Sequence, residues 1–530
     1  MVEFDAKEGR LLRAAGVVAV MAVPMLALAA AQERPGAPPG LGIVSAVRST
    51  LEHHPLLEAQ RQQVAISRAV KQQRTGAFDH QLAWEAAERY TRTPLLLAEQ
   101  AGVVRSVFTE NSFTLQGSAQ RLLRSGISFG PTVALDRATG DSQTLGGLNR
   151  ARIGFDGTVP LLRGRGKAVV AAGETAAAIE VEASTYDLGR QAADLVRSTA
   201  TSYWQYLASL RQLEIATQSE TRGREYVQAV TALVEADRLP RSEVNQAQAN
   251  FDSRAAGRFG LEQQVVEARS ALALAMGVPA DQIAALPAPS DAFPDGLAEA
   301  PLSRTPDNVQ RLIDLALRRR ADYLSAEKKV EAAGVLRQAT ANRLRPQFDL
   351  AMSGGYSSLK PGRGAGDFLV SPFTDTSGGD AFVGVRWSRP MANTTALGEV
   401  AEAEAAYQQA MWLRTERARV IAADVMNAVT ALQTGFLRLG KATDAVRGFR
   451  AALDGEQDKL RLGLGSITDL LTVEGRLNDA LQELVGAQQA YAVGVVQLRY
   501  ASGTLIDAVD LRPPAPDVFF RPLAGAGGLL

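Results

Sequence analysis

Few residues in this chain have the types and spacing that covalent chemistry requires. Gly126-Ile-Ser-Phe-Gly130 matches the G-x-S-x-G pattern of a serine nucleophile. Such a serine needs a strand–turn–helix elbow and a histidine later in the chain. The histidines of this chain, His53, His54 and His80, all precede it. The sequence therefore argues against a hydrolase.

Metal and cofactor sites have equally little support. The adjacent pair His53-His54 lacks further ligands, and a protein zinc site needs three or four; a pair on a helix surface is the simpler interpretation. Gly164-Arg-Gly-Lys167 lacks the full phosphate-loop pattern. The chain has no Cys, which excludes disulfides, thiolate ligands and a lipid anchor on an N-terminal cysteine. We expect no enzyme, no catalytic residue, no metal and no cofactor.

Charge and targeting signals indicate a secreted protein. The chain has 57 Lys and Arg residues and 57 Asp and Glu residues, so these charges balance. It therefore lacks the net positive charge that would favour binding of nucleic acid. Basic residues precede the apolar segment 17–31, which ends in Ala29-Ala30-Ala31. We interpret residues 1–31 as a signal peptide, because the segment is shorter than the ~20 residues that span a bilayer. We expect no later transmembrane helix, so a position in a membrane would require a closed β-barrel.

The mature chain contains an internal duplication. The segment from about Thr199 to Gly277 aligns without gaps on the segment from about Val425 to Gly503. Each copy is a helical hairpin preceded by a short helix and by alternating strand segments. The predicted organisation is a first repeat at 32–278, a linker at 279–306, a second repeat at 307–505 and a flexible C-terminal tail at 506–530.

The elements that these repeats predict are unusually long. One helix is expected from Lys167 to about Asp237 and its partner from Ala396 to about Leu460, each about 100 Å at the rise of an α-helix. Both would be followed by returning helices, at 242–276 and 468–501, and each repeat would open with a single helix, at 43–75 and 309–343. The last helix has the heptad spacing of coiled-coil packing.

Alternating segments of about 9–11 residues lie between these helices. Leu82, Trp84 and Ala86 occupy alternate positions in the first copy. Ile153, Phe155 and Val159 do the same, opposite Arg152, Asp156 and Thr158. The second copy offers two similar runs, 347–356 and 381–388. That length and alternation are typical of tilted membrane strands with a lipid face and a lumen face. Trp84, Tyr356 and Trp387 would suit an interfacial aromatic girdle, although core aromatics of a soluble sheet would give the same pattern.

The first copy contains an extra stretch, 90–150. It holds further alternating pieces at 113–122 and 127–135. The sequence leaves two interpretations open for it, an elongated strand pair or an outside loop.

Three features together resemble the TolC-like outer-membrane efflux protein family. They are the strand-to-helix turn Thr158-Val-Pro-Leu-Leu-Arg-Gly-Arg-Gly166, the hairpin turn Leu462-Gly-Leu-Gly-Ser-Ile-Thr-Asp-Leu-Leu471, and the duplicated ending Leu272-x4-Gly277 and Leu498-x4-Gly503. The resemblance covers about Val44 to Leu505.

The resemblance implies an α+β membrane fold. A homotrimer would close one outer-membrane β-barrel from four strands per chain, twelve per trimer, and a long α-helical barrel would continue it through the periplasm. It implies an outer-membrane channel-tunnel of a tripartite efflux or type I secretion system. Its partners would be outer-membrane lipid, a periplasmic adaptor protein and an inner-membrane pump. The alternative is a periplasmic helical scaffold or adaptor without a channel, which has a single hairpin flanked by small β-domains.

The hairpin turns are the candidate gate. Asp469 and Glu243 begin the returning helices, and three-fold symmetry would repeat each as a ring of carboxylates, which selects cations and narrows a pore. The alternative is that both are first-turn acids that the helix dipole favours, with Thr468 and Ser242 as caps. The remaining candidates for the tip turn and for contact with an adaptor are Gly463, Gly465, Arg461, Arg238 and Arg241.

Overall fold

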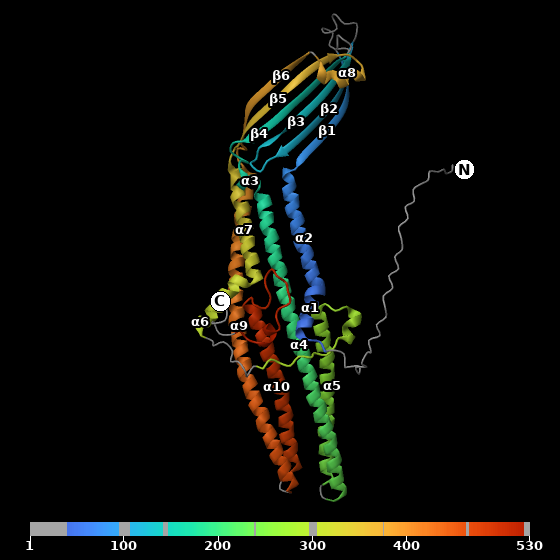
Figure 1. Ribbon diagram of the computed structural model, residues 1–530, viewed down its shortest axis with the longest axis vertical. Coiled ribbons are helices and arrows are strands. Elements are labelled where there is room, and N and C mark those ends of the chain that lie inside the picture. The colour runs from blue at the N-terminus through green and yellow to red at the C-terminus, as the bar shows by residue number, and fades with distance from the viewer. Residues whose placement is uncertain are drawn as a thin grey trace, which may run out of the picture.

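The computed structural model describes residues 40–94, 106–140, 147–237, 240–295, 305–374, 376–462 and 466–523. The predicted signal peptide, residues 1–31, lies outside this part of the chain. The molecule is a long rod with a β-sheet at one end and two helical hairpins at the other, and shorter helices surround its middle (Figure 1). This division follows the sequence pattern, because the alternating segments occupy one end and the long helices the rest.

Six strands form one antiparallel sheet in chain order. They are β1 (His80–Pro94), β2 (Val107–Leu122), β3 (Ser128–Gly140), β4 (Leu148–Pro160), β5 (Gln347–Pro361) and β6 (Ser377–Ser388). The prediction of four strands per chain was therefore wrong. The two additional strands, β2 and β3, come from the stretch 90–150, where the structure has the strand pair and not an outside loop.

The strands are also longer than the predicted 9–11 residues. The shortest, β6, has 12 residues and the longest, β2, has 16. The predicted length assumed that each strand ends with its apolar run. The hydrogen-bonded ladders continue past that run, so the pairing includes polar residues beyond it.

Each repeat opens with two helices instead of the single helix that was predicted. They are α1 (Ile43–His53) and α2 (Pro55–Thr75) in the first repeat, and α6 (Pro306–Arg319) and α7 (Ala321–Ala341) in the second. His54 is extended because Pro55 disfavours the helical region for the residue before it. Arg320 is extended without a proline, and its buried guanidinium binds Asp322 at 2.8 Å and Asp424 at 2.9 Å.

The long helices form two antiparallel hairpins. After a short α3 (Lys167–Val170), α4 (Ala172–Glu235) returns through α5 (Ser242–Met276), and α9 (Thr394–Arg461) returns through α10 (Ile467–Ala501). With 64 and 68 residues, α4 and α9 are each about 100 Å long. Both return helices end beside a left-handed glycine, Gly277 and Gly503, a conformation that glycine adopts without steric cost.

One described helix, α9, contains an 18-residue window with a mean hydropathy of 1.4, enough by length and composition to cross a membrane. The sequence was expected to contain no such helix after the signal peptide, because that prediction required a continuous apolar run. Only 33% of the window is buried. Exposed apolar residues of α9, among them Trp412, Leu413 and Leu437, leave an uncovered surface along the rod.

The largest hydrophobic core lies at the middle of the rod. Trp204 of α4 is fully buried there, between Tyr203, Phe293 and Phe520, whose rings lie 5.3–5.8 Å from its own. Phe293 belongs to the predicted linker 279–306, which also holds a short 3-10 helix (Ala280–Ala285). Asp291 of the same linker accepts hydrogen bonds from the Ile43 backbone and the Tyr203 hydroxyl.

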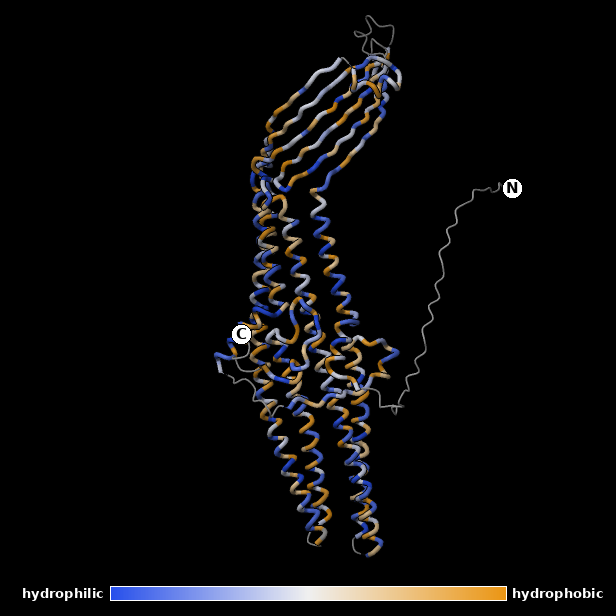
Figure 2. Tube along the Cα trace, viewed as in Figure 1, coloured by the Kyte–Doolittle hydropathy of each residue, from blue (hydrophilic) through white to orange (hydrophobic). Residues whose placement is uncertain are grey.

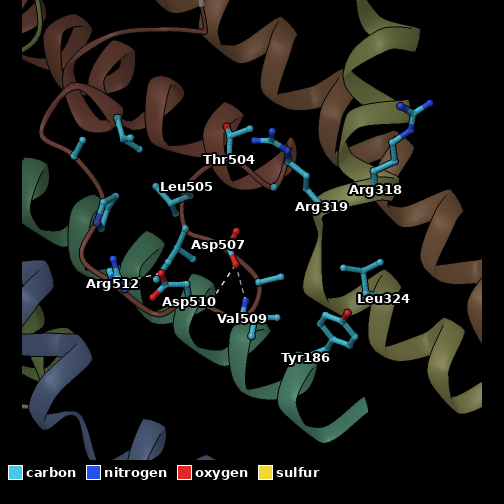
Figure 3. A pocket seen from close by; sticks show the side chains of 16 residues that line it. Tyr186, Arg318, Arg319, Leu324, Thr504, Leu505, Asp507, Val509, Asp510 and Arg512 are labelled. Carbon is cyan, nitrogen blue, oxygen red and sulfur yellow. Dashed lines mark hydrogen bonds and ion pairs between the residues drawn. The ribbon is translucent and has the colours of Figure 1, made fainter. Parts of the chain in front are cut away.

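The C-terminal tail packs on this core. The expectation of a flexible tail at 506–530 was therefore wrong for residues 506–523. Leu505, the last residue of the second repeat, and Phe519, in a short α11 (Asp517–Phe520), are both almost fully buried. Figure 3 shows the strap that connects them, which faces Tyr186 of α4 and Leu324 of α7 across a pocket. Asp507 accepts backbone hydrogen bonds from Val509 and Asp510 and holds this strap in a turn. Proline and glycine composition gave no sign of this docking.

Candidate functional site

The two faces of the sheet differ in polarity. One face, the apolar face, carries residues that pair across the sheet in a single register: Trp84, Gly117, Val133, Ile153 and Tyr356. Closer to the helices, the same face carries further apolar side chains, among them Leu82, Phe155, Met352, Val383, Val385 and Trp387. Hydrophobic and hydrophilic positions alternate along the strands (Figure 2). Such an exposed apolar surface is typical of a membrane or protein contact.

The opposite, polar face carries short hydroxyl, amide and charged side chains. Glu85 pairs with Gln116, and Ala87 with Thr114, while Phe382 is an apolar exception. Arg152 on β4 reaches Asp380 on β6 at 2.6 Å, across the intervening β5. The polar face therefore suits contact with water, as a lumen does.

The sheet is rigidly joined to the helices where β4 turns into α3. Leu161 donates its backbone N–H to Phe348, and Gly164 donates to the Asn342 side chain at 2.8 Å. Nearby, Arg124 at the end of β2 binds Glu174 of α4 with two hydrogen bonds of 2.7 Å. The same turn motif that suggested the family thus connects both repeats to one sheet.

The second anchor, Arg124–Glu174, gives a testable dependence on pH. The Arg124 guanidinium lowers the pKa of the Glu174 carboxyl. A lowered folded-state pKa means that the pair stabilises the fold above the ordinary pKa of glutamate and is lost as the pH falls through the lowered value. We expect a spin label at Ser125→Cys to become more mobile on acidification through this range. The added substitution Glu174→Gln should make the label mobile at neutral pH and remove the transition; an unchanged spectrum in that variant would contradict the anchor.

At the other end of the rod, the two hairpins lie side by side and contact each other. The Tyr226 hydroxyl of α4 donates to the Ile467 carbonyl at the start of α10, at 3.3 Å. Burial, together with the charges of Glu243 and Glu474, raises the pKa of Tyr226 to about 12. Tyr226 therefore keeps its proton, and remains a donor, over the physiological range.

A charged cluster, the Glu474 brace, joins the same hairpins. Glu474 of α10 is buried, and its carboxylate accepts from Arg222 of α4 at 2.7 Å and from Arg254 of α5 at 3.1 Å. It is therefore a single anion shared by two cations from the other repeat. Sequence reasoning missed it, because neither arginine lies near Glu474 in the chain and no local pattern marks the pair.

The predicted gate residues lie at these tips. Asp469 is exposed in the first turn of α10, and Glu243 is half-buried in the first turn of α5. The expected caps were wrong: the Ser466 side chain, not Thr468, caps α10, and α5 begins at Ser242 without a side-chain cap. Arg241 is exposed beside it.

The remaining tip candidates are only partly described. Arg238, Gly463 and Gly465 lie outside the described residues, and Arg461 is described only as the last residue of α9.

The motifs that suggested chemistry have structural positions. Ser128 begins β3 directly after a tight turn from β2, not at a strand–turn–helix elbow. The His54 Nδ1 accepts the backbone N–H of Leu56 and caps α2. Among the described residues, no group of three or more His, Cys, Asp or Glu is arranged to hold a metal.

Comparisons with known proteins agree with this architecture. Residues 312–504 match the family model described as "Outer membrane efflux protein". The chain is 26% identical over 319 residues to outer membrane protein TolC of Vibrio cholerae. The aligned region covers 59% of this chain and 68% of that protein.

Solved structures share the fold at low identity. The CmeC outer membrane channel of Campylobacter jejuni gives a TM-score of 0.65 at 12% identity, over 92% of this chain and 94% of CmeC. The MtrE outer membrane channel of Neisseria gonorrhoeae, solved in its open state, gives a TM-score of 0.61 at 15% identity, over 89% and 91%. Residues 312–504 thus match the outer membrane efflux protein family, and the amphipathic sheet and the paired hairpins of about 100 Å give the chain the fold of these solved outer membrane channels.

Proposed function

We propose that this protein is the outer-membrane channel-tunnel of a tripartite efflux or secretion system and that it conducts cargo passively, without catalysis. One observation carries the proposal. A sheet with an exposed apolar face and a polar face continues directly into hairpins long enough to cross much of the periplasm. Only a closed barrel satisfies the backbone of such strands in lipid.

The partners follow from the same geometry. A single chain leaves the outer edges of β1 and β6 without a strand partner among the described residues. We therefore propose a homotrimer in which neighbouring sheets close one barrel. The exposed apolar residues of α9 would face adjacent copies or a periplasmic adaptor, and an inner-membrane pump would supply the cargo. A channel-free adaptor is not favoured, since it gives no role to a six-stranded amphipathic sheet.

Cell fractionation and mass measurement test this proposal. We expect the full chain in the outer membrane and, after detergent extraction, a particle of three chains that forms an ion-conducting pore in a planar bilayer. A water-soluble periplasmic monomer would overturn it. The apolar face would then be the buried side of an ordinary interface between periplasmic proteins.

The carboxylates of the tip supply the selectivity of the pore in this proposal. Asp469 is exposed and lies in the first helical turn, where three copies would surround the axis. We expect Asp469→Asn to lower the preference of the pore for K⁺ over Cl⁻, because a ring of carboxylates concentrates cations. Reversal potentials in a salt gradient measure this preference.

Asp252→Asn is the matched control, because it removes the same charge from an exposed position about three turns along α5. It should leave the preference unchanged. Equal reversal potentials for wild type and Asp469→Asn would remove Asp469 from the gate and support the alternative, a first-turn acid. Glu243→Asn tests the second ring in the same way.

A further inference from the structure

We propose that the β2–β3 hairpin is an integral part of the pore wall, so that three chains close a barrel of eighteen strands and not twelve. Each chain contributes a six-stranded sheet. The inference rests on the homotrimer of the proposed function. It concerns the width of the conduit and hence the size of cargo that the membrane segment admits.

The hairpin continues both faces of the sheet without a change of phase. On the apolar face, Leu115 of β2 pairs with Leu135 of β3, which pairs with Ala151 of β4. One residue along, Thr114 and Asp136 pair on the polar face. A one-residue slip at either junction would exchange the faces. The register thus places the hairpin in the same layer as β1 and β4, with its apolar residues toward lipid.

Side-chain packing at both junctions fits this placement. On the β1 side, the Trp84 indole lies over Gly117, where even a Cβ atom would come within 2.5 Å of the ring. Glycine at the position opposite a large aromatic residue leaves the space that the ring fills. On the β4 side, Phe129 and Phe155 stack with ring centroids 5.9 Å apart. Both contacts lie on the apolar face and join the hairpin to its neighbours.

The turn between β2 and β3 is fastened to the helical body. Arg124 binds Glu174 of α4 and lies 4.7 Å from the centre of the Phe78 ring. The Ser125 carbonyl accepts the backbone N–H of Gly166 at 2.9 Å. A hairpin projecting as an outside loop would have no such contacts at its periplasmic turn. The hairpin therefore spans the same height as the strands on either side.

The connection between β5 and β6 does not fill the polar face. It carries α8 (Ala365–Val370), whose Phe368 packs edge-on against Phe113 with ring centroids 5.5 Å apart. Phe113 is in phase with Leu115, on the apolar face, at the end of the sheet far from the helices. The described part of this connection thus covers the outside of the rim.

The barrel can close with six strands per chain. In the antiparallel sheet, β1 and β6 run in opposite directions, so β6 of one chain and β1 of the next would also pair antiparallel. Barrel diameter grows roughly linearly with strand number, so eighteen strands give about one and a half times the diameter of twelve. On its polar face, β2 carries the side chains of Ser112, Thr114, Gln116 and Ser118. These side chains are too short to fill the additional width of the lumen.

Site-directed spin labelling tests the position of the hairpin, because the natural chain has no Cys. Single cysteines would be placed at Leu115 and Val133 on the apolar face and at Thr114 and Thr132 on the polar face. We expect labels at the first pair to be reached by oxygen dissolved in lipid, and labels at the second by a water-soluble nickel chelate. Ile153→Cys and Arg152→Cys on β4 are the matched controls for the two environments.

Strand number is tested separately, by copy number and barrel width. Native mass spectrometry of the full-length protein gives the number of chains, and end-on averages from electron cryomicroscopy give the diameter. A variant lacking residues 95–147, with Pro94 joined to Leu148 by a short glycine turn, keeps β1 and β4 in antiparallel order. We expect its barrel to have about two thirds of the wild-type diameter. Both measurements are independent of whether the periplasmic tip is open.

The outcomes are distinguishable. Alternating accessibility in a wide trimer supports the proposal. Uniform access of the nickel chelate to all four hairpin labels, while the β4 controls alternate, would overturn it and leave the tunnel intact. Two chains per particle would also overturn it, because two sheets make only twelve strands. A monomer with water-exposed β4 controls would instead reject the proposed function itself.

Discussion

Replacing Glu474 by glutamine should open the periplasmic end of the tunnel. Its carboxylate is buried and is shared by Arg222 and Arg254, which belong to the other hairpin. Loss of the charge leaves two guanidinium groups facing each other. Charge-assisted hydrogen bonds contribute about 1.5–3 kcal/mol each. If about 2 kcal/mol of that favours the closed tip, the open population rises roughly 30-fold. Single-channel recording in planar bilayers measures the open probability.

The chain offers a matched control for this variant. Glu483 of α10 binds Arg438 of α9 at 2.6 Å, so that pair lies within one hairpin and is about half exposed. Exposed pairs contribute about 0–1 kcal/mol, and Glu483→Gln should leave the open probability unchanged. Arg254→Gln should act in the direction of Glu474→Gln. Equal open probabilities for Glu474→Gln and wild type, with the same thermal stability, would show that the brace does not hold the tip closed.

Truncation within the C-terminal tail should strongly destabilise the protein. Phe519 is fully buried, and Phe520 contacts the Trp204 ring edge-on at 5.6 Å. Removing a buried phenylalanine costs about 3–5 kcal/mol. A chain ending at Pro516 loses both rings, so we expect a large fall in the temperature at which the detergent-extracted oligomer unfolds. Circular dichroism during heating measures that temperature.

A chain ending at Leu523 is the control for this truncation. It keeps Phe519, Phe520 and the buried Leu523. We expect it to unfold at the wild-type temperature, and Phe519→Ala in the full chain to fall between the two. If the chain ending at Pro516 were as stable as wild type, the tail would be an unneeded covering and not part of the core.

Much of the architecture follows from local pattern in the sequence. The return helix predicted at 242–276 has those bounds in the structure. The predicted ends of the other long helices agree with the observed ends within a few residues, because proline and glycine residues lie near the ends of these helices. The alternation of Ile153 and Phe155 with polar neighbours correctly indicated β4. Hydrophobic periodicity and helix-breaking residues are properties of short segments, so both can be recognised in a single sequence.

What the sequence did not predict depends on contacts between distant segments. The β2–β3 pair was ambiguous because the strand signal of each membrane segment is weak and an outside loop tolerates the same residues. The Glu474 brace unites residues from both repeats, so no window contains it. The tail looked flexible because its prolines and glycines predict irregular backbone, which says nothing about where Phe519 is buried.

The free edges of β1 and β6 have a consequence for the kinetics of assembly. In a lone chain, neither edge has a strand partner in the described part of the chain, and lipid cannot satisfy the backbone donors and acceptors that such an edge presents. Insertion of one chain is therefore uphill, and only the closed ring releases the full free energy of burial. The rate of insertion should then rise more steeply than in proportion to subunit supply. At low expression, subunits would accumulate in the periplasm, exposed to proteases, before any appear in the membrane.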